Sequence, residues 1–174
     1  MEELDIYDED RRRTGRVITR GERLQEGEYR LAVHVCIFNS RDEMLIQQRQ
    51  PFKAGWPNRW DMSLGGCATA GESSREAAER EAWEELGYRV DLGDIRPHLT
   101  VHFDVGFDDI YLVEDDVDLA GLRLQYQEVQ AVKWCSEAEI LEMIRAGSFI
   151  PYHPSLISLL FAMRKGYGGY SREE

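Results

Sequence analysis

Three glutamates, Glu81, Glu84 and Glu85, lie in a segment whose composition favours a helix. Because each helical residue turns by about 100°, Glu84 lies about 60° to one side of Glu81 and Glu85 about 40° to the other. Two carboxylates about 4 Å apart repel by about 4 kcal/mol at an effective dielectric constant of about 20, so protons, basic partners or divalent cations must offset their charge. Oxygen ligands of this kind suit Mg²⁺ or Mn²⁺, and we therefore expect metal-dependent chemistry.

The simpler alternative is that these acids form a solvated helix face, as most charge runs do. Against it, the segment has little apolar surface for docking. The residues on which its packing would rest are Ala78, Ala82, Trp83 and Leu86. A helix that packs so little surface is expected to have a function on its polar face.

The pattern of the surrounding sequence predicts a mixed α/β fold that positions these glutamates. Ser73 begins the expected helix, which runs to Leu86 and ends at Gly87 as its C-cap. Apolar and alternating runs predict strands at 29–38, 44–49, 61–66, 97–105, 109–114 and 129–135. Two further helices are expected at the C-terminal end, one from Ser136, with a capping-box pattern, to about Gly147, and one from Pro154 to before Gly166.

Composition limits the class of protein. The 174 residues predict one domain over residues 1–174. A net charge of −12 disfavours binding to duplex nucleic acid, and the apolar runs are too short to cross a membrane. Three scattered cysteines and an acidic N-terminus without a secretory pattern predict a reducing, cytoplasmic location.

The glutamates belong to a longer pattern with fixed spacing over residues 66–88. Its members are Gly66, Glu72, Arg80, Glu81, Glu84, Glu85 and Gly87. This pattern resembles the signature box of the Nudix hydrolases. Ala82 and Tyr88 depart from the usual larger aliphatic residues, which affects packing more than chemistry. The resemblance implies an α/β/α sandwich with a mixed β-sheet flanked by helices, preceded here by a strand extension at 1–28 and followed by a short tail at 166–174.

The resemblance also implies a role for each residue of the box. The metal ligands would be Glu81, Glu84, Glu85 and the Gly65 carbonyl, while Glu72, Arg80 and Gly87 would be structural. Three residues remain candidates for the general base: Glu81, Glu85 and Glu128. Glu128 lies just before a predicted strand. The expected substrate-binding residues are Arg30, Arg49, Trp56, Gly65 and Gly66.

The N-terminal half, including LAVHVCIFN and WPNRWDMSLGG, also resembles isopentenyl-diphosphate isomerases, which share this fold. The residues that isomerase chemistry needs are absent from the matching positions of this chain. In ungapped alignment two metal-binding histidines of the isomerases fall on Arg23 and Arg30, the catalytic cysteine falls on Gly65, and an adjacent histidine falls on Cys67. Glycine cannot supply a proton, so this route to isomerisation is disfavoured.

The sequence therefore predicts a Mg²⁺- or Mn²⁺-dependent pyrophosphohydrolase. Its substrate would be a nucleoside di- or triphosphate or another diphosphate-linked small molecule, cleaved by attack of water on phosphorus. Two alternatives stay open, an isopentenyl-diphosphate isomerase and a non-catalytic module that binds a nucleotide. The apolar segment 156–163 could pack in the core or form a homodimer interface.

Overall fold

Two strands rich in β-branched and large apolar residues run parallel at the centre of the sheet, β3 (Arg30–Phe38) and β8 (Gly106–Glu114). They belong to a computed structural model that describes residues 2–170. Within those residues the sheet has seven strands, and every other pair in it is antiparallel. The remaining strands are β4 (Glu43–Arg49), β5 (Trp60–Asp61), β6 (Leu64–Cys67), β7 (Leu99–Phe103) and β9 (Val129–Ser136). The mixed sheet expected from the sequence is confirmed.

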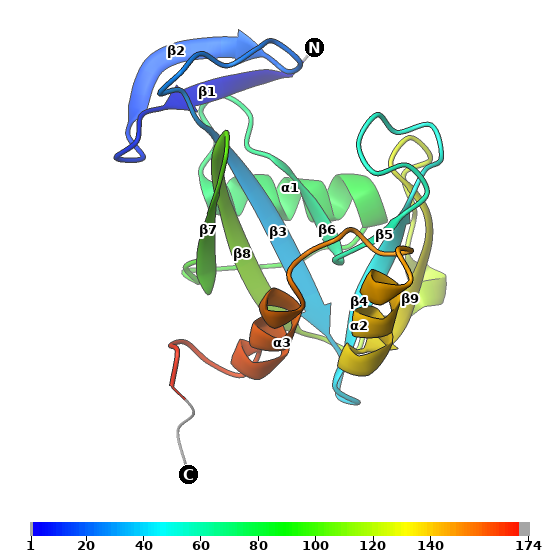
Figure 1. Cartoon of the computed structure of the whole chain (residues 1–174). Coiled ribbons are helices and arrows are strands. Elements are labelled where there is room, and N and C mark those ends of the chain that lie inside the picture. The colour runs from blue at the N-terminus through cyan, green and yellow to red at the C-terminus, as the bar shows by residue number, and fades with distance from the viewer. Residues whose placement is uncertain (1, 171–174) are drawn as a thin grey trace.

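Helices cover both faces of this sheet (Figure 1). On one face lies α1 (Ser74–Leu86), and on the other lie α2 (Glu137–Arg145) and α3 (Pro154–Met163). The period of two in β3 divides the core accordingly: Val33 and Val35 pack in the cluster with α1, whereas Cys36 packs in the cluster with α2 and α3. The predicted α/β/α arrangement is therefore confirmed. A short helical turn, η1 (Leu119–Gly121), lies in the long segment between β8 and β9.

The N-terminal segment forms a separate hairpin of β1 (Glu3–Tyr7) and β2 (Arg13–Thr19), above the main sheet in Figure 1. Its apolar side, with Leu4, Ile6 and Ile18, is buried together with Cys67 of β6. The backbone amide of Ala70 also donates to the carbonyl of Glu3 at 2.8 Å. The hairpin is thus attached to the loop that leads into α1.

The expected single strand at 61–66 is instead two short strands with different partners. Residues 60–61 pair with β4, whereas residues 64–67 pair with β3. Between them, the Ser63 hydroxyl accepts from the amide of Ile37 at 2.9 Å and donates to the carbonyl of Leu45 at 2.5 Å. β3 and β4 pair directly only at Phe38 and Met44, so this buried hydroxyl connects two strands that have separated.

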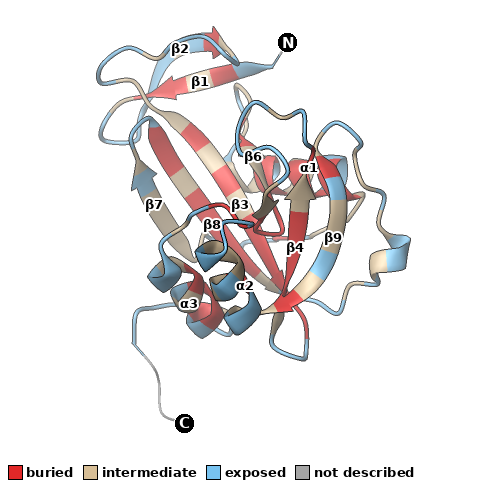
Figure 2. Ribbon diagram, turned by 45° about the vertical axis from the view of Figure 1, so that its right-hand side comes forward, coloured by how far each residue is buried: buried red, intermediate tan, exposed pale blue. Residues whose placement is uncertain are grey.

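The C-terminal helix packs in the core, with Ile157, Leu160 and Phe161 buried (Figure 2). Of the tail expected at 166–174, the described residues end at 170, and residues 171–174 lie outside the description. Tyr167 stacks on the ring of His98 with centroids 4.2 Å apart. Within residues 2–170, no helix has both the length and the apolar character needed to cross a membrane.

Candidate active site

Local signals fix both ends of the helix that carries the glutamates. Ser73 and Glu76 form a reciprocal capping box at the start of α1, and Gly87 ends the helix with a φ of 63°, a left-handed conformation that favours glycine. The side packed against the sheet is made of small residues and one leucine: Ala77, Ala78, Ala82 and Leu86. Trp83, expected to help in docking, is instead 42% exposed, with the guanidinium groups of Arg89 and Arg123 over its ring.

Two glycines of β6 let the backbone approach the glutamates. A Cβ atom at Gly66 would overlap with the Glu81 carboxylate, and one at Gly65 would overlap with the His34 ring. The Gly65 amide donates to Oε2 of Glu85 at 3.4 Å. Glycine at position 66 therefore leaves room for the Glu81 carboxylate beside the strand, and glycine at position 65 leaves room for His34.

Arg80 connects the box loop to the helix. Its guanidinium makes a bidentate ion pair with Glu72, with N···O distances of 2.8 and 3.0 Å, and donates to the carbonyl of Cys67 at 3.0 Å. Its Nη1 atom also lies 3.0 Å from Oε1 of Glu81 and 2.9 Å from Oε2 of Glu84. Arg80 thus supplies a basic partner to two of the three clustered glutamates.

Glu85 is the third clustered glutamate, and it has no ion-pair partner within residues 2–170. Its side chain is almost fully buried and accepts a hydrogen bond from the Gln47 amide at 3.1 Å. Burial, reinforced by the neighbouring charge of Glu81, raises the pKa of Glu85 to about 8. Burial also raises the pKa of Glu81. The site therefore holds more acidic groups than its own basic residues pair with, and burial favours their protonated forms.

Seven of the residues expected at the site line one cleft between α1, β6 and the surrounding loops. They are Arg49, Gly65, Gly66, Glu81, Glu84, Glu85 and Glu128. Glu128 is held in place because the loop before β9 is attached to the end of α1: the amide of Gln125 donates to the Glu85 carbonyl at 2.8 Å. The Glu128 carboxylate forms an ion pair with Lys53.

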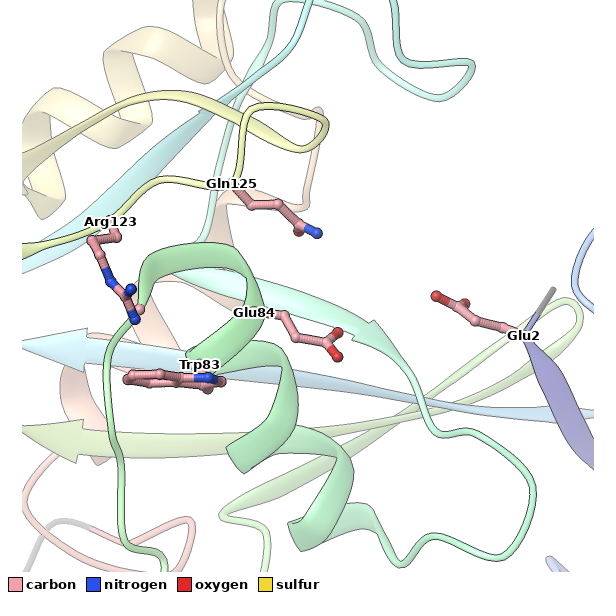
Figure 3. Close-up of a pocket in the computed structure, with 6 residues that line it drawn as sticks. Glu2, Trp83, Glu84, Arg123 and Gln125 are labelled. Atoms are coloured by element: carbon pink, nitrogen blue, oxygen red, sulfur yellow. The ribbon is translucent and has the colours of Figure 1, made fainter.

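The sequence did not predict Glu2, Arg20 and Gln125 in this cleft. Glu2 and Arg20 flank the hairpin strands, and antiparallel register places them side by side, 2.6 Å apart in an ion pair. A neighbouring hollow of about 540 Å³ lies beside α1. Figure 3 shows the carboxylates of Glu2 and Glu84, which line it, pointing toward one another. Only pairing of the hairpin across its turn could have revealed Glu2 and Arg20, and only the attachment of the loop before β9 to α1 could have revealed Gln125.

Two expected substrate-binding residues lie elsewhere in the described part of the chain. Arg30 starts β3, where its guanidinium lies over the ring of Phe103, 5.9 Å from the centroid. Trp56 is 49% exposed in the loop between β4 and β5. Neither lines the cleft that contains the glutamates.

The cleft suits a divalent cation by its donor chemistry, although its side chains are not arranged as a finished coordination sphere. Carboxylate and backbone carbonyl oxygens are the ligands that Mg²⁺ and Mn²⁺ take, and Glu85 is a buried acid without a counter-ion. Within residues 2–170, however, no three acidic, histidine or cysteine groups converge at metal-binding distances. Arg80 contacts one oxygen of Glu81 and one of Glu84, so cation binding would require the carboxylates to move closer together.

Comparison with known sequences gives related proteins over most of the chain. Residues 28–153 match the NUDIX domain family. An uncharacterized Nudix hydrolase of Listeria innocua is 47% identical over 152 residues, which cover 87% of this chain and 90% of the relative. An isopentenyl-diphosphate Delta-isomerase of Shigella flexneri is 29% identical over 126 residues, covering 67% of this chain and 66% of the isomerase.

Solved structures agree with the sequence relatives. A crystal structure of a protein from Deinococcus radiodurans superimposes with a TM-score of 0.74 at 26% identity, over 91% of this chain and 97% of that protein. A MutT protein from Methanosarcina mazei has a TM-score of 0.62 at 24% identity, over 82% of this chain and 99% of its own, and shares the fold. Together with the intact box on α1, these matches show that the chain belongs to the Nudix family and is a hydrolase of phosphoanhydride bonds.

Proposed function

We propose that this protein is a Mg²⁺- or Mn²⁺-dependent pyrophosphohydrolase that cleaves a nucleoside di- or triphosphate, or another diphosphate-linked metabolite. The observation that carries the proposal is Glu85, a buried carboxylate beside Glu81 with no basic partner in residues 2–170. A divalent cation would stabilise the ionised form of Glu85, and the substrate's diphosphate would complete the coordination of the cation.

The proposal assigns the cation to Glu81, Glu84, Glu85 and the carbonyl of Gly65, all of which line the same cleft. When bound, Mg²⁺ or Mn²⁺ would neutralise phosphate charge and lower the pKa of a bound water molecule. Arg49 lines the cleft beside the acids and would orient the phosphates by charge-assisted hydrogen bonds.

A general base must take a proton from the attacking water. Glu128 faces the glutamates across the cleft and enters it from a different segment of the chain, which suits a base that acts on water near the cation. Its present partner is Lys53, which would have to exchange to a substrate phosphate before Glu128 could act. Glu81 and Glu85 remain the other two candidates.

The test is a phosphate-release screen with purified protein and either Mg²⁺ or Mn²⁺. The panel would contain nucleoside di- and triphosphates, nucleotide sugars, dinucleotides and isoprenoid diphosphates, with inorganic pyrophosphatase added to reveal released pyrophosphate. We expect cation-dependent release from one class and its loss, by at least about 100-fold, in Glu85→Gln.

The matched control is Glu142→Gln, which removes an exposed glutamate on α2, far from α1 on the other face of the sheet. It should hydrolyse the substrate at the rate of the unmodified protein. Full activity of a correctly folded Glu85→Gln variant would overturn the role assigned to Glu85.

Isomerase activity has less support from the same geometry. Gly65, where the isomerases would place their cysteine, lies so close to His34 that a side chain does not fit. Cys67 is 8% exposed and packs against the hairpin, and burial raises the pKa of its thiol. Deuterium exchange into an allylic product without phosphate release would favour the isomerase instead, and ligand-induced thermal stabilisation without turnover would favour a binding module.

We further propose that the protein acts on its small-molecule substrate in a reducing cytoplasm. The three cysteines are free and buried. This placement would be contradicted by disulfide-linked forms in the protein isolated from cells under thiol-trapping conditions.

A further inference from the structure

A second hollow, of about 490 Å³, opens beside the cleft of the glutamates. The two hollows share Arg20, Arg49, Lys53 and Glu128, so they are continuous. A substrate whose diphosphate lies on the glutamates would therefore extend into the second hollow. The residues on its walls are the ones that the rest of the substrate would meet.

Three cations line this second hollow, and they come from two separate parts of the chain, the hairpin and the end of β4 with its following loop. Arg20 follows β2 of the hairpin, Arg49 ends β4, and Lys53 lies in the loop after it. Such convergence is notable in a chain with a net charge of −12. Cations held on separate segments around one hollow are the arrangement that binds a phosphate or another anionic group.

The present partners of these cations differ in how far they are exposed to solvent, and the pair of Arg20 is the most open. Arg20 and Glu2 are 46% and 44% exposed in their ion pair, and exposed pairs of this kind contribute little to stability. The pair of Lys53 with Glu128 is also partly open to solvent, and Arg49 donates from Nε to the carbonyl of Gly55 at 3.0 Å, with its Nη1 atom 3.7 Å from Asp61. An anionic ligand could replace these contacts with stronger charge-assisted bonds.

Two aromatic side chains stand at the edge of the same hollow. Phe52 is 57% exposed and lines it, and Tyr126, 71% exposed, contacts Phe52 with ring centroids 5.8 Å apart. They belong to the two loops that also carry Lys53 and Glu128. Exposed aromatic rings held next to an anion-binding hollow are suited to contact a planar ring by stacking.

We propose that this second hollow is the subsite that selects the substrate, with Arg20 and Lys53 binding an anionic group beyond the scissile diphosphate and Phe52 and Tyr126 contacting a planar ring. The inference rests on the proposed hydrolase function, since it places the diphosphate on the glutamates of α1. The favoured ligand carries both a planar ring and more than two phosphate groups. Nucleotide sugars have a planar ring but only two phosphate groups, and isoprenoid diphosphates lack both features.

The test measures dissociation constants in the presence of Mg²⁺ for three probes that are not turned over. Two are imido analogues of adenosine triphosphate and adenosine diphosphate in which every bridging oxygen between phosphorus atoms is replaced by NH, and the third is imidotriphosphate with both bridges replaced in the same way, which has no ring. We expect Arg20→Gln to weaken the triphosphate about tenfold and the diphosphate much less. The double variant Phe52→Ala, Tyr126→Ala should weaken both nucleotides about tenfold and leave imidotriphosphate unchanged.

Matched controls remove side chains of the same kinds that line neither hollow. Arg12→Gln removes an arginine of the hairpin that is exposed and paired only with Asp10 among the described residues, and Tyr170→Ala removes a tyrosine that is 90% exposed. Both should bind all three probes as the unmodified protein does. Circular dichroism and the melting temperature would verify that every variant is folded.

Two results would overturn the subsite: equal weakening of all three probes by Arg20→Gln, or unchanged nucleotide binding in the aromatic double variant. These results are separable from a failure of the hydrolase proposal, in which the unmodified protein binds the probes with the expected selectivity but releases no phosphate from their hydrolysable counterparts. Hydrolysis with unselective binding would leave the function standing and remove the subsite.

Discussion

At the scale of single residues, the site depends on the absence of a side chain at position 66. Gly66 has no side chain where a Cβ atom would overlap with the Glu81 carboxylate. We therefore expect Gly66→Ala to push Glu81 out of the cleft and to lower kcat/KM by about 100-fold, since a displacement of about 1 Å in a catalytic group has effects of this size. Steady-state kinetics on the substrate found by the release screen would measure the loss.

The control for this prediction is Gly121→Ala in η1. A Cβ atom there meets nothing within 4 Å, and the residue does not need a left-handed backbone. Its kcat/KM should stay within about twofold of the unmodified value. If Gly66→Ala is as active as this control, the close approach of β6 to Glu81 has no catalytic importance.

Glu72 stabilises the loop that leads into α1, and the direction of its pKa shift predicts how this stabilisation changes with pH. Although burial opposes ionisation, the bidentate contact with Arg80 and the amide of Thr69 lower the pKa of Glu72 below its ordinary value of 4.5. A group whose pKa falls on folding stabilises the protein above its unfolded pKa, and this stabilisation is lost as the pH falls through the lower, folded value. Glu72→Gln should therefore cost about 1 to 2 kcal/mol at pH 7 and progressively less below about pH 4.5.

Urea unfolding at several pH values would measure this difference in the free energy of unfolding. The pair Asp10 and Arg12 supplies the control, because both side chains are largely exposed, and Asp10→Asn should change stability little at any pH. A Glu72→Gln deficit that is the same at low and neutral pH would mean that the carboxylate contributes by its shape and not by its charge.

At the scale of elements, the sequence predicts the helix ends, because interactions between residues close in the chain determine them. Ser73, Gly87 and Ser136 mark helix ends that the structure confirms, because capping uses neighbours in the chain. The division of 61–66 into two strands could not be predicted in this way. It depends on Ser63 bonding to two strands that are distant in the sequence.

The same limit applies to the candidate site. The glutamates of α1 follow from their spacing on one helix, whereas Arg20 reaches the cleft only because β1 and β2 pair and the hairpin folds onto the box loop. Ungapped alignment pointed instead to Arg23 and Arg30, and Arg30 lies at the start of β3, outside the cleft. Residues spaced along one helix can be recognised from the sequence, but contacts between separate elements can be predicted only when the topology of the fold is known.

Two neighbouring residues of β4 pack on opposite faces of the sheet, so substitutions of them can show whether the two core layers affect the site separately. Leu45 and Ile46 are both fully buried, yet Leu45 packs in the cluster that contains α1 and Ile46 in the cluster that contains α2 and α3. Substitution of either by alanine should cost about 2 to 5 kcal/mol. Because α1 carries the glutamates, we expect Leu45→Ala also to lower kcat/KM, by about tenfold, at temperatures where the variant is fully folded.

Ile46→Ala serves as the matched variant for this prediction. It should show a similar loss in the free energy of unfolding, while its kcat/KM stays within about twofold of the unmodified value. Equal kinetic effects of the two substitutions would show that strain passes through the sheet and that the layers do not act separately.

At the scale of the whole molecule, charge links stability to the site. The chain has a net charge of −12, and such an excess opposes the compact state through self-repulsion. In the cleft, Arg80 neutralises part of the charge of Glu81 and Glu84, while Glu85 lacks a basic partner in the described residues. A cation bound there would stabilise the folded protein and leave the unfolded chain unaffected.

We therefore expect Mg²⁺ or Mn²⁺ to raise the free energy of unfolding by about 2.7 kcal/mol at 100 times its dissociation constant. Thermal unfolding in a cation titration would measure the effect, with NaCl of equal ionic strength to separate binding from screening of the net charge. Glu85→Gln should lose most of the stabilisation by the divalent cation, and Glu142→Gln, on α2, should keep it. If NaCl raised the melting temperature as much as Mg²⁺ does, general screening would account for the effect, and the glutamates of α1 would not form the binding site that we assign to them.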